Sequence, residues 1–85
     1  MNKEEEYTYT VLFEPAEEGG YVVTVPALPG CVTQGDTLEE AREMATDAIL
    51  GYLESLRKDG APIPTDTPLA LEPVKEQIRV ALQPT

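Results

Sequence analysis

The amino-acid sequence predicts an α+β fold of two layers, in which one face of a β-sheet packs on a single long helix. Two patterns predict it. Four segments alternate between apolar and polar residues, as strands with one buried face do. One central segment repeats its apolar residues at helical spacing. The predicted order is β-β-β-α-β, an antiparallel three-stranded meander followed by a long helix and a final strand.

The meander begins at residues 7–14, whose aromatic and β-branched residues share one face: Tyr7, Tyr9, Val11 and Phe13. Residues 15–20, PAEEGG, predict a turn, and residues 21–25 resume the strand pattern until Pro26. We expect these two strands to form a hairpin. Residues 31–34 predict a short third strand, closed by Gly35 and Asp36.

The helix is predicted from Thr37 to Asp59. Its apolar stripe consists of Leu38, Ala41, Ala45, Ala48, Ile49, Tyr52, Leu53 and Leu56. Thr37 and Glu40 fit a capping box, in which the Thr37 hydroxyl accepts from the amide of Glu40 and Glu40 accepts from the amide of Thr37. Gly60 predicts the end of the helix.

The C-terminal part predicts one crossover and one strand. Residues 61–73 are rich in proline and cannot continue the helix. Residues 74–82 alternate, with Val74, Ile78, Val80 and Leu82 on one face and Glu76 as the exception. The opposite, polar face of this strand is expected to be exposed or at an edge. Residues 1–85 are therefore expected to form a single domain, with residues 1–6 as an acidic tail.

The charge is strongly negative, with 16 acidic residues, 6 basic residues and a net charge of −10. Binding to nucleic acid or an anionic membrane requires clustered Lys and Arg, so neither is expected. One cysteine cannot form an intramolecular disulfide, and the start of the chain lacks the apolar core of a signal peptide. These features predict a cytoplasmic protein.

Catalytic interpretations find little support in the sequence. Cys31 has no histidine to generate a thiolate, and is expected to be a small buried residue. No metal site or other cofactor is predicted. A metal-dependent nuclease needs converging carboxylates, for which Glu14, Glu43, Asp47 and Glu76 are the candidates. The four tyrosines could stack on bases, but without a basic groove we expect them in the core or at interfaces.

One stretch resembles a known family. Residues 21–41, YVVTVPALPGCVTQGDTLEEA, are similar to the HicB-like antitoxins, in which a strand precedes P-x-L-P-G-C, then T-x-G-x-T, then E-E-A at the start of a long helix. The later segment Gly60-Ala-Pro-Ile-Pro also resembles the family. The resemblance covers about residues 7–82.

The resemblance implies a partial ribonuclease-H-like fold without catalytic activity. It also implies that the domain binds and neutralises HicA, a small basic toxin that cleaves mRNA. Longer members add a DNA-binding module, for which this chain has no matching segment, so direct DNA binding is not expected. An acidic patch is the expected partner-binding surface, formed by Asp36, Glu39, Glu40 and Glu43.

Two alternatives remain open from the sequence. The chain could be a structural scaffold without a toxin partner, because a small core, four tyrosines and edge strands favour a homo-oligomer, either a dimer or a tetramer. It could also be a residual metal-dependent nuclease that uses Glu14 and Asp47. The leading hypothesis is a non-enzymatic antitoxin that binds a HicA-like basic toxin.

Overall fold

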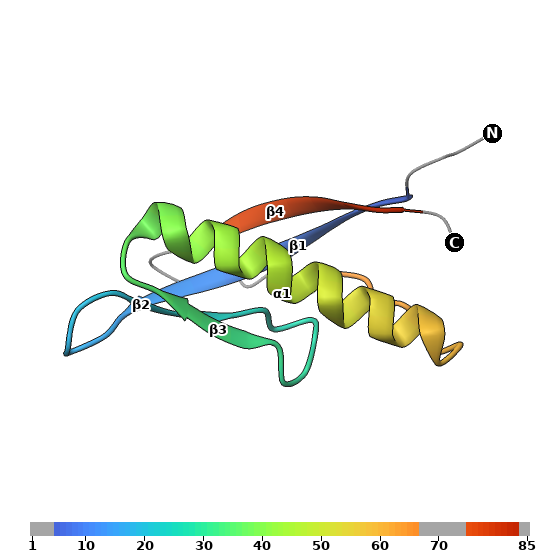
Figure 1. The fold of residues 1–85 in the computed structure, drawn as a ribbon, viewed down its shortest axis with the longest axis horizontal. Helices are drawn as coiled ribbons and strands as arrows, with labels where there is room; N and C mark the ends of the chain where they lie inside the picture. The colour runs from blue at the N-terminus through green and yellow to red at the C-terminus, as the bar shows by residue number, and fades with distance from the viewer. Residues whose placement is uncertain (1–4, 67–74, 84–85) are drawn as a thin grey trace.

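The computed structural model describes residues 5–66 and 75–83 and contains one four-stranded antiparallel sheet and one helix (Figure 1). The elements are β1 (Glu5–Pro15), β2 (Tyr21–Thr24), β3 (Val32–Gly35), α1 (Leu38–Lys58) and β4 (Lys75–Leu82). The strand order is β3-β2-β1-β4, so the last strand pairs with the first. The predicted α+β fold and its β-β-β-α-β order are confirmed.

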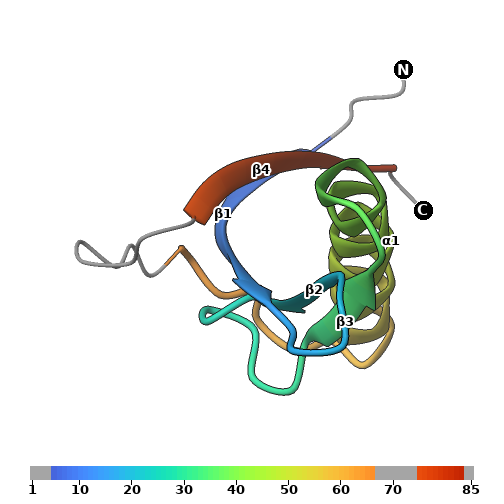
Figure 2. The ribbon, with the colours of Figure 1, turned by 90° about the vertical axis from the view of Figure 1, so that its left-hand side faces the viewer.

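The sheet curves around one side of α1 (Figure 2). The core lies between the concave face and the helix. Its fully buried large side chains are Tyr9, Val11, Phe13, Val23, Val25, Leu28, Ile49, Leu53 and Leu82. Strand alternation places Tyr9, Val11 and Phe13 of β1 in this core, as the period-two pattern predicted, whereas Tyr7 on the same face is only partly buried. Among the described residues, no helix is long and apolar enough to cross a bilayer.

Strand β1 has two partners along its length. Leu12 to Pro15 pair with β2, whereas Glu5 to Leu12 pair with β4. The predicted hairpin is confirmed, and β2 is short because the chain leaves the sheet just before Pro26. The observed strand β1 begins two residues before the predicted start at Tyr7, because the pairing with β4 continues to Glu5. Val74, predicted as the start of the last strand, lies outside the described residues.

The ends of α1 agree with the predicted caps except at one hydrogen bond. Thr37 is the N-cap, and its hydroxyl accepts from the amide of Glu40 at 3.0 Å. The Glu40 carboxylate accepts from the amide of Asp36 at 2.6 Å, so the prediction that it binds the amide of Thr37 is wrong. The long Glu40 side chain reaches one residue farther back. At the other end Gly60 has a φ of +72° and follows the C-cap Asp59.

Gly35 determines how closely α1 approaches the sheet. A Cβ atom at this position would lie 2.5 Å from the backbone nitrogen of Ala41 and 2.7 Å from its Cα atom. Only a residue without a side chain fits there. The T-x-G segment of the sequence therefore positions the first turn of the helix directly against β3.

Glu76, the exception to the apolar face of the last strand, has a partner on the helix. The Arg42 Nε atom donates to both Glu76 carboxylate oxygens, at 2.7 and 2.9 Å. The hydrogen bond to Glu76 raises the pKa of the Arg42 guanidinium. The ion pair joins α1 to β4 and explains why a charged residue is tolerated on the side of the strand that faces the helix.

Cys31 is buried, as predicted, and burial raises the pKa of its thiol. The thiolate is therefore scarce in the folded protein at pH 8. We expect a disulfide reagent to label Cys31 at least roughly tenfold more slowly in the native protein than in denaturant. Because a raised pKa favours the protonated folded state, the free energy of unfolding should also fall as the pH rises above about 9. Cys31→Ala should reduce that fall. Equal labelling rates in buffer and in denaturant would contradict the buried position.

Candidate partner-binding surface

The four acidic residues expected to contact a partner are all exposed in the structure. Asp36 and Glu40 meet at the junction between β3 and α1, where the Glu40 carboxylate accepts from the backbone amide of Asp36. Glu39 and Glu43 lie on the outer side of the helix. Glu40 thus has a capping role, while Glu39 and Glu43 have no comparable structural task among the described contacts.

Glu39, Glu43 and Asp47 form an acidic stripe along the exposed side of α1. Their spacing of four residues places each carboxylate next to the following one. Like charges at this spacing destabilise a helix by roughly 0.2–0.5 kcal/mol per pair. None of the three forms an ion pair within the part of the chain that the structure describes. From the sequence, Asp47 was considered only as a carboxylate of a nuclease. Its spacing of four residues from Glu43 already places the two side chains next to each other on the helix.

The arginines are engaged with the β1–β4 side of the sheet, although Arg42 also interacts electrostatically with Glu39 of the acidic stripe. Arg42 binds Glu76 on β4, and Arg79 on β4 is 3.9 Å from Glu6. Arg57 donates to the backbone carbonyl of Gln83 at 2.5 Å. These contacts hold the three guanidinium groups near the β4 strand. Glu43 and Asp47, on the exposed side of α1, have no ion pair among the described contacts.

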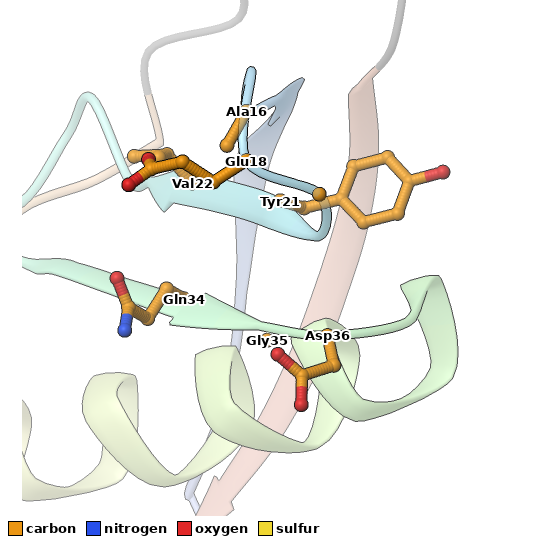
Figure 3. A pocket seen from close by; sticks show the side chains of 8 residues that line it. Ala16, Glu18, Tyr21, Val22, Gln34, Gly35 and Asp36 are labelled. Carbon is orange, nitrogen blue, oxygen red and sulfur yellow. The ribbon is translucent and has the colours of Figure 1, made fainter.

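A hollow of about 300 Å³ lies beside the start of the helix, between the β1–β2 loop and the end of β3. It is lined by Ala16, Glu18, Gly19, Tyr21, Val22, Gln34, Gly35 and Asp36. In Figure 3 Glu18 lies beside β2 and Asp36 lies past the end of β3, so the two carboxylates do not converge. The sequence pattern did not indicate that Glu18 lies here, because this residue belongs to the β1–β2 turn and is distant from the helix along the sequence.

The carboxylates considered for a nuclease do not gather at one place. Glu14 is exposed on the face of the sheet that points away from α1, and Asp47 is exposed on the helix. Glu76 is bound by Arg42. Within residues 5–66 and 75–83, no three His, Cys, Asp or Glu residues are grouped as metal ligands would be.

The tyrosines have packing roles, as expected. The hydroxyl of the buried Tyr9 donates to the carbonyl of Pro64 at 2.7 Å, and burial is the main cause that raises its pKa. The Tyr52 hydroxyl donates to the carbonyl of Pro29 at 2.8 Å. Tyr7 and Tyr21 pack partly buried against the core. These contacts tie the loop after β2 and the segment after α1 to the body of the domain.

Comparison with known proteins decides the family. Residues 9–80 match the model of a family described as HicB_like antitoxin of bacterial toxin-antitoxin system. The chain belongs to the HicB-like antitoxin family. The resemblance inferred from residues 21–41 is thereby confirmed.

Curated relatives agree with the family. The chain is 45% identical over 73 residues to Antitoxin HicB 1 of Photorhabdus laumondii, covering 86% of this chain and 47% of that protein. It is 43% identical over 61 residues to Antitoxin HicB of Escherichia coli K12, covering 72% of this chain and 44% of that protein. It is 53% identical over 58 residues to a UPF0150 protein of Thermoplasma acidophilum, covering 68% of this chain and 84% of that protein. The chain thus spans about half the length of the two HicB antitoxins.

Solved structures share the fold. The N-terminal domain of the Burkholderia pseudomallei antitoxin HicB superposes with a TM-score of 0.73 and 25% identity, covering 87% of this chain and 95% of that one. A chain of the HicA3 and HicB3 toxin-antitoxin complex gives a TM-score of 0.63 at 22% identity, covering 91% and 99% of the two chains. The two-layer domain of this HicB-like protein is therefore the fold of a HicB N-terminal domain.

Proposed function

We propose that this HicB-like protein is an antitoxin that binds and neutralises a small basic HicA-type toxin that cleaves mRNA. Membership of the antitoxin family carries the proposal. The occurrence of the same fold in a HicA3 and HicB3 complex supports the choice of partner. Neutralisation is proposed to occur by binding rather than by catalysis, and in the cytoplasm, where mRNA is the target.

The acidic surface is proposed to receive the basic toxin. Opposite charges across an interface accelerate the encounter and favour the correct partner. The acidic stripe of Glu39, Glu43 and Asp47 lies on the exposed side of α1, and Asp36 with Glu40 continues it to the start of the helix. An occupied stripe would also relieve the repulsion among its own carboxylates. The relief of this repulsion would add to the binding free energy, which is a physical reason for three like charges in a row on a binding surface.

The proposal is tested with a HicA-type toxin encoded beside the gene. Neutralising the stripe with Glu39→Gln, Glu43→Gln and Asp47→Asn should weaken binding by roughly 10- to 100-fold, equivalent to about 1.4–2.8 kcal/mol. The loss should be mainly in the association rate, and should shrink at high salt. Binding is measured by surface immobilisation of the toxin at several salt concentrations.

The matched control neutralises three exposed acids of the hairpin instead, with Glu14→Gln, Glu17→Gln and Glu18→Gln. Both triple variants change the net charge from −10 to −7, because each removes three of the 16 acidic charges. Long-range steering is therefore reduced equally, and any difference between them is local. Failure of the unaltered protein to bind any HicA-type toxin would refute the proposed function. Equal binding by the two variants would refute only the acidic stripe.

A further inference from the structure

Five of the six glycines of the chain have a reason within the domain for lacking a side chain. Gly35 lies against the backbone of Ala41. Four others adopt a positive φ, which residues with a side chain rarely do: Gly19, Gly20, Gly30 and Gly60. Gly51 has neither reason. Its φ is not positive, and a Cβ atom built on it would meet nothing within 4 Å.

A glycine at the place of Gly51 is unfavourable for the helix. Glycine destabilises a helix interior more than any residue except proline, because its backbone loses more freedom on folding. Gly51 is exposed inside α1, and the helix continues beyond it without a break to Lys58. Among the described contacts, no feature of the domain requires a glycine here. A contact from outside the domain would require one, because a missing side chain lets another chain approach the helix backbone closely.

Met44 lies on the same side of α1 as Gly51, since seven residues make nearly two turns of 3.6 residues. It is 40% exposed, and it is the one exposed large apolar residue within α1, all of which the structure describes. Methionine is flexible and polarizable, so it adapts to the shape of a contacting surface. The sheet covers only one side of α1 (Figure 2). The uncovered side therefore offers an apolar side chain and, two turns on, bare backbone.

Carboxylates lie on both sides of this bare backbone along the helix. Asp47 precedes Gly51 by four residues and Glu54 follows it by three, so both are its neighbours on the helix surface. Both are exposed, and neither forms an ion pair within the described part of the chain. The acidic stripe thus ends one turn before Gly51. A positively charged group that approaches Gly51 meets a carboxylate on either side.

We propose that a basic partner chain packs directly on the glycine face of α1, which consists of Met44, Asp47, Gly51 and Glu54. The partner backbone crosses α1 at Gly51. The aliphatic stem of a partner lysine or arginine lies on the bare helix backbone, and its charged end reaches Asp47 or Glu54. This inference rests on the proposed function, which supplies the basic toxin. The acidic stripe attracts the toxin, whereas Gly51 sets how closely it approaches.

Charge favours a basic partner over a second copy of this chain. Two copies that met at the glycine face would bring Asp47 and Glu54 of one chain against the same carboxylates of the other. Each chain already has a net charge of −10, and like charges across an interface are unfavourable. A basic segment would gain from the same carboxylates.

Gly51→Ala tests the proposal through two effects of opposite sign. The urea midpoint of unfolding should rise by about 0.3–1 M, because alanine is the better helix residue and its methyl group meets nothing in the domain. Binding to the HicA-type toxin should weaken roughly 5- to 100-fold, because the added methyl group overpacks the interface. The loss should lie in the dissociation rate and persist at high salt, unlike the loss caused by neutralising the acidic stripe.

Ser55→Ala is the matched control. It also places alanine at an exposed position of α1 and should raise the urea midpoint, but it adds no atom to the surface. Toxin binding by this variant should therefore stay within about twofold of the unaltered protein. Met44→Gln keeps the length of the side chain but makes it polar, and should weaken toxin binding roughly 3- to 10-fold.

Three results would overturn the inference. One is a lower urea midpoint for Gly51→Ala, which would give Gly51 a role within the domain. Another is toxin binding by Gly51→Ala as tight as that of the unaltered protein, which would leave the proposed function intact. The third is a change in sedimenting mass on this substitution, which would assign the glycine face to a second copy. Failure of the unaltered protein to bind the toxin would refute the proposed function and this inference together.

Discussion

Leu53→Ala is expected to destabilise the domain by about 2–5 kcal/mol, the range for removing a fully buried leucine. Leu53 is 0% exposed and packs in the core between α1 and the sheet. Its truncation removes apolar contacts and leaves a cavity that the short helix–sheet interface has few ways to fill. An 85-residue domain has a total stability of about 4–13 kcal/mol, so the change removes a large part of it.

The free energy of unfolding is measured by urea titration at one fixed chain concentration, because any self-association adds to apparent stability. Leu56→Ala is the matched control. Both leucines belong to the predicted apolar stripe, but Leu56 is only partly buried. Its loss should cost less than about half as much, in proportion to the smaller apolar area returned to water. Equal losses would show that Leu53 and Leu56 are buried to the same depth.

The sequence sufficed for the elements whose causes are local. Period-two alternation and the glycine pair predicted the β1–β2 hairpin, and Thr37 predicted the start of α1, because each signal lies within a few residues of its effect. The depth of burial could not be read in this way. Spacing places Leu53 and Leu56 on the same stripe, but only the curvature of the sheet decides which one it covers.

Long-range pairing was the part that the sequence left open. Strand β4 pairs with β1, across most of the chain, and no local pattern states that choice. Glu76 was visible as an exception, yet its partner Arg42 is 34 residues away. The predicted acidic patch was exposed as expected, but Asp47 joins it through helical spacing, and Glu40 is drawn into the cap. The exposure of these acidic residues could be predicted from their charge. Which of them lie together could not, because that depends on contacts in three dimensions.

Asp66→Ala is expected to destabilise the domain by about 2–3 kcal/mol, because it leaves Thr10 without its acceptors. Asp66 Oδ1 accepts from the amide of Thr10 at 2.7 Å, and Oδ2 accepts from the Thr10 hydroxyl at 2.8 Å. Thr10 is only 2% exposed, so water cannot easily replace the carboxylate. Asp66 lies in the proline-rich segment after α1, for which the sequence predicted only a crossover.

Two comparisons separate the contributions of this contact. Asp66→Asn keeps one carbonyl oxygen for the Thr10 amide but loses the charge, so we expect an intermediate loss of stability. Asp47→Ala removes an exposed acid and should change stability by less than about 0.5 kcal/mol.

A double-mutant cycle of Thr10→Val and Asp66→Ala then isolates the hydroxyl–carboxylate bond, because the Thr10 amide is present in all four proteins. A coupling energy near zero would mean that the bond from the Thr10 hydroxyl contributes little, and that the backbone amide of Thr10 is the more important donor to Asp66. Since β2 pairs with β1 only from Leu12 onward, that amide lies in the part of the strand that β2 leaves uncovered. At this position the Asp66 side chain takes the place of a strand partner for β1.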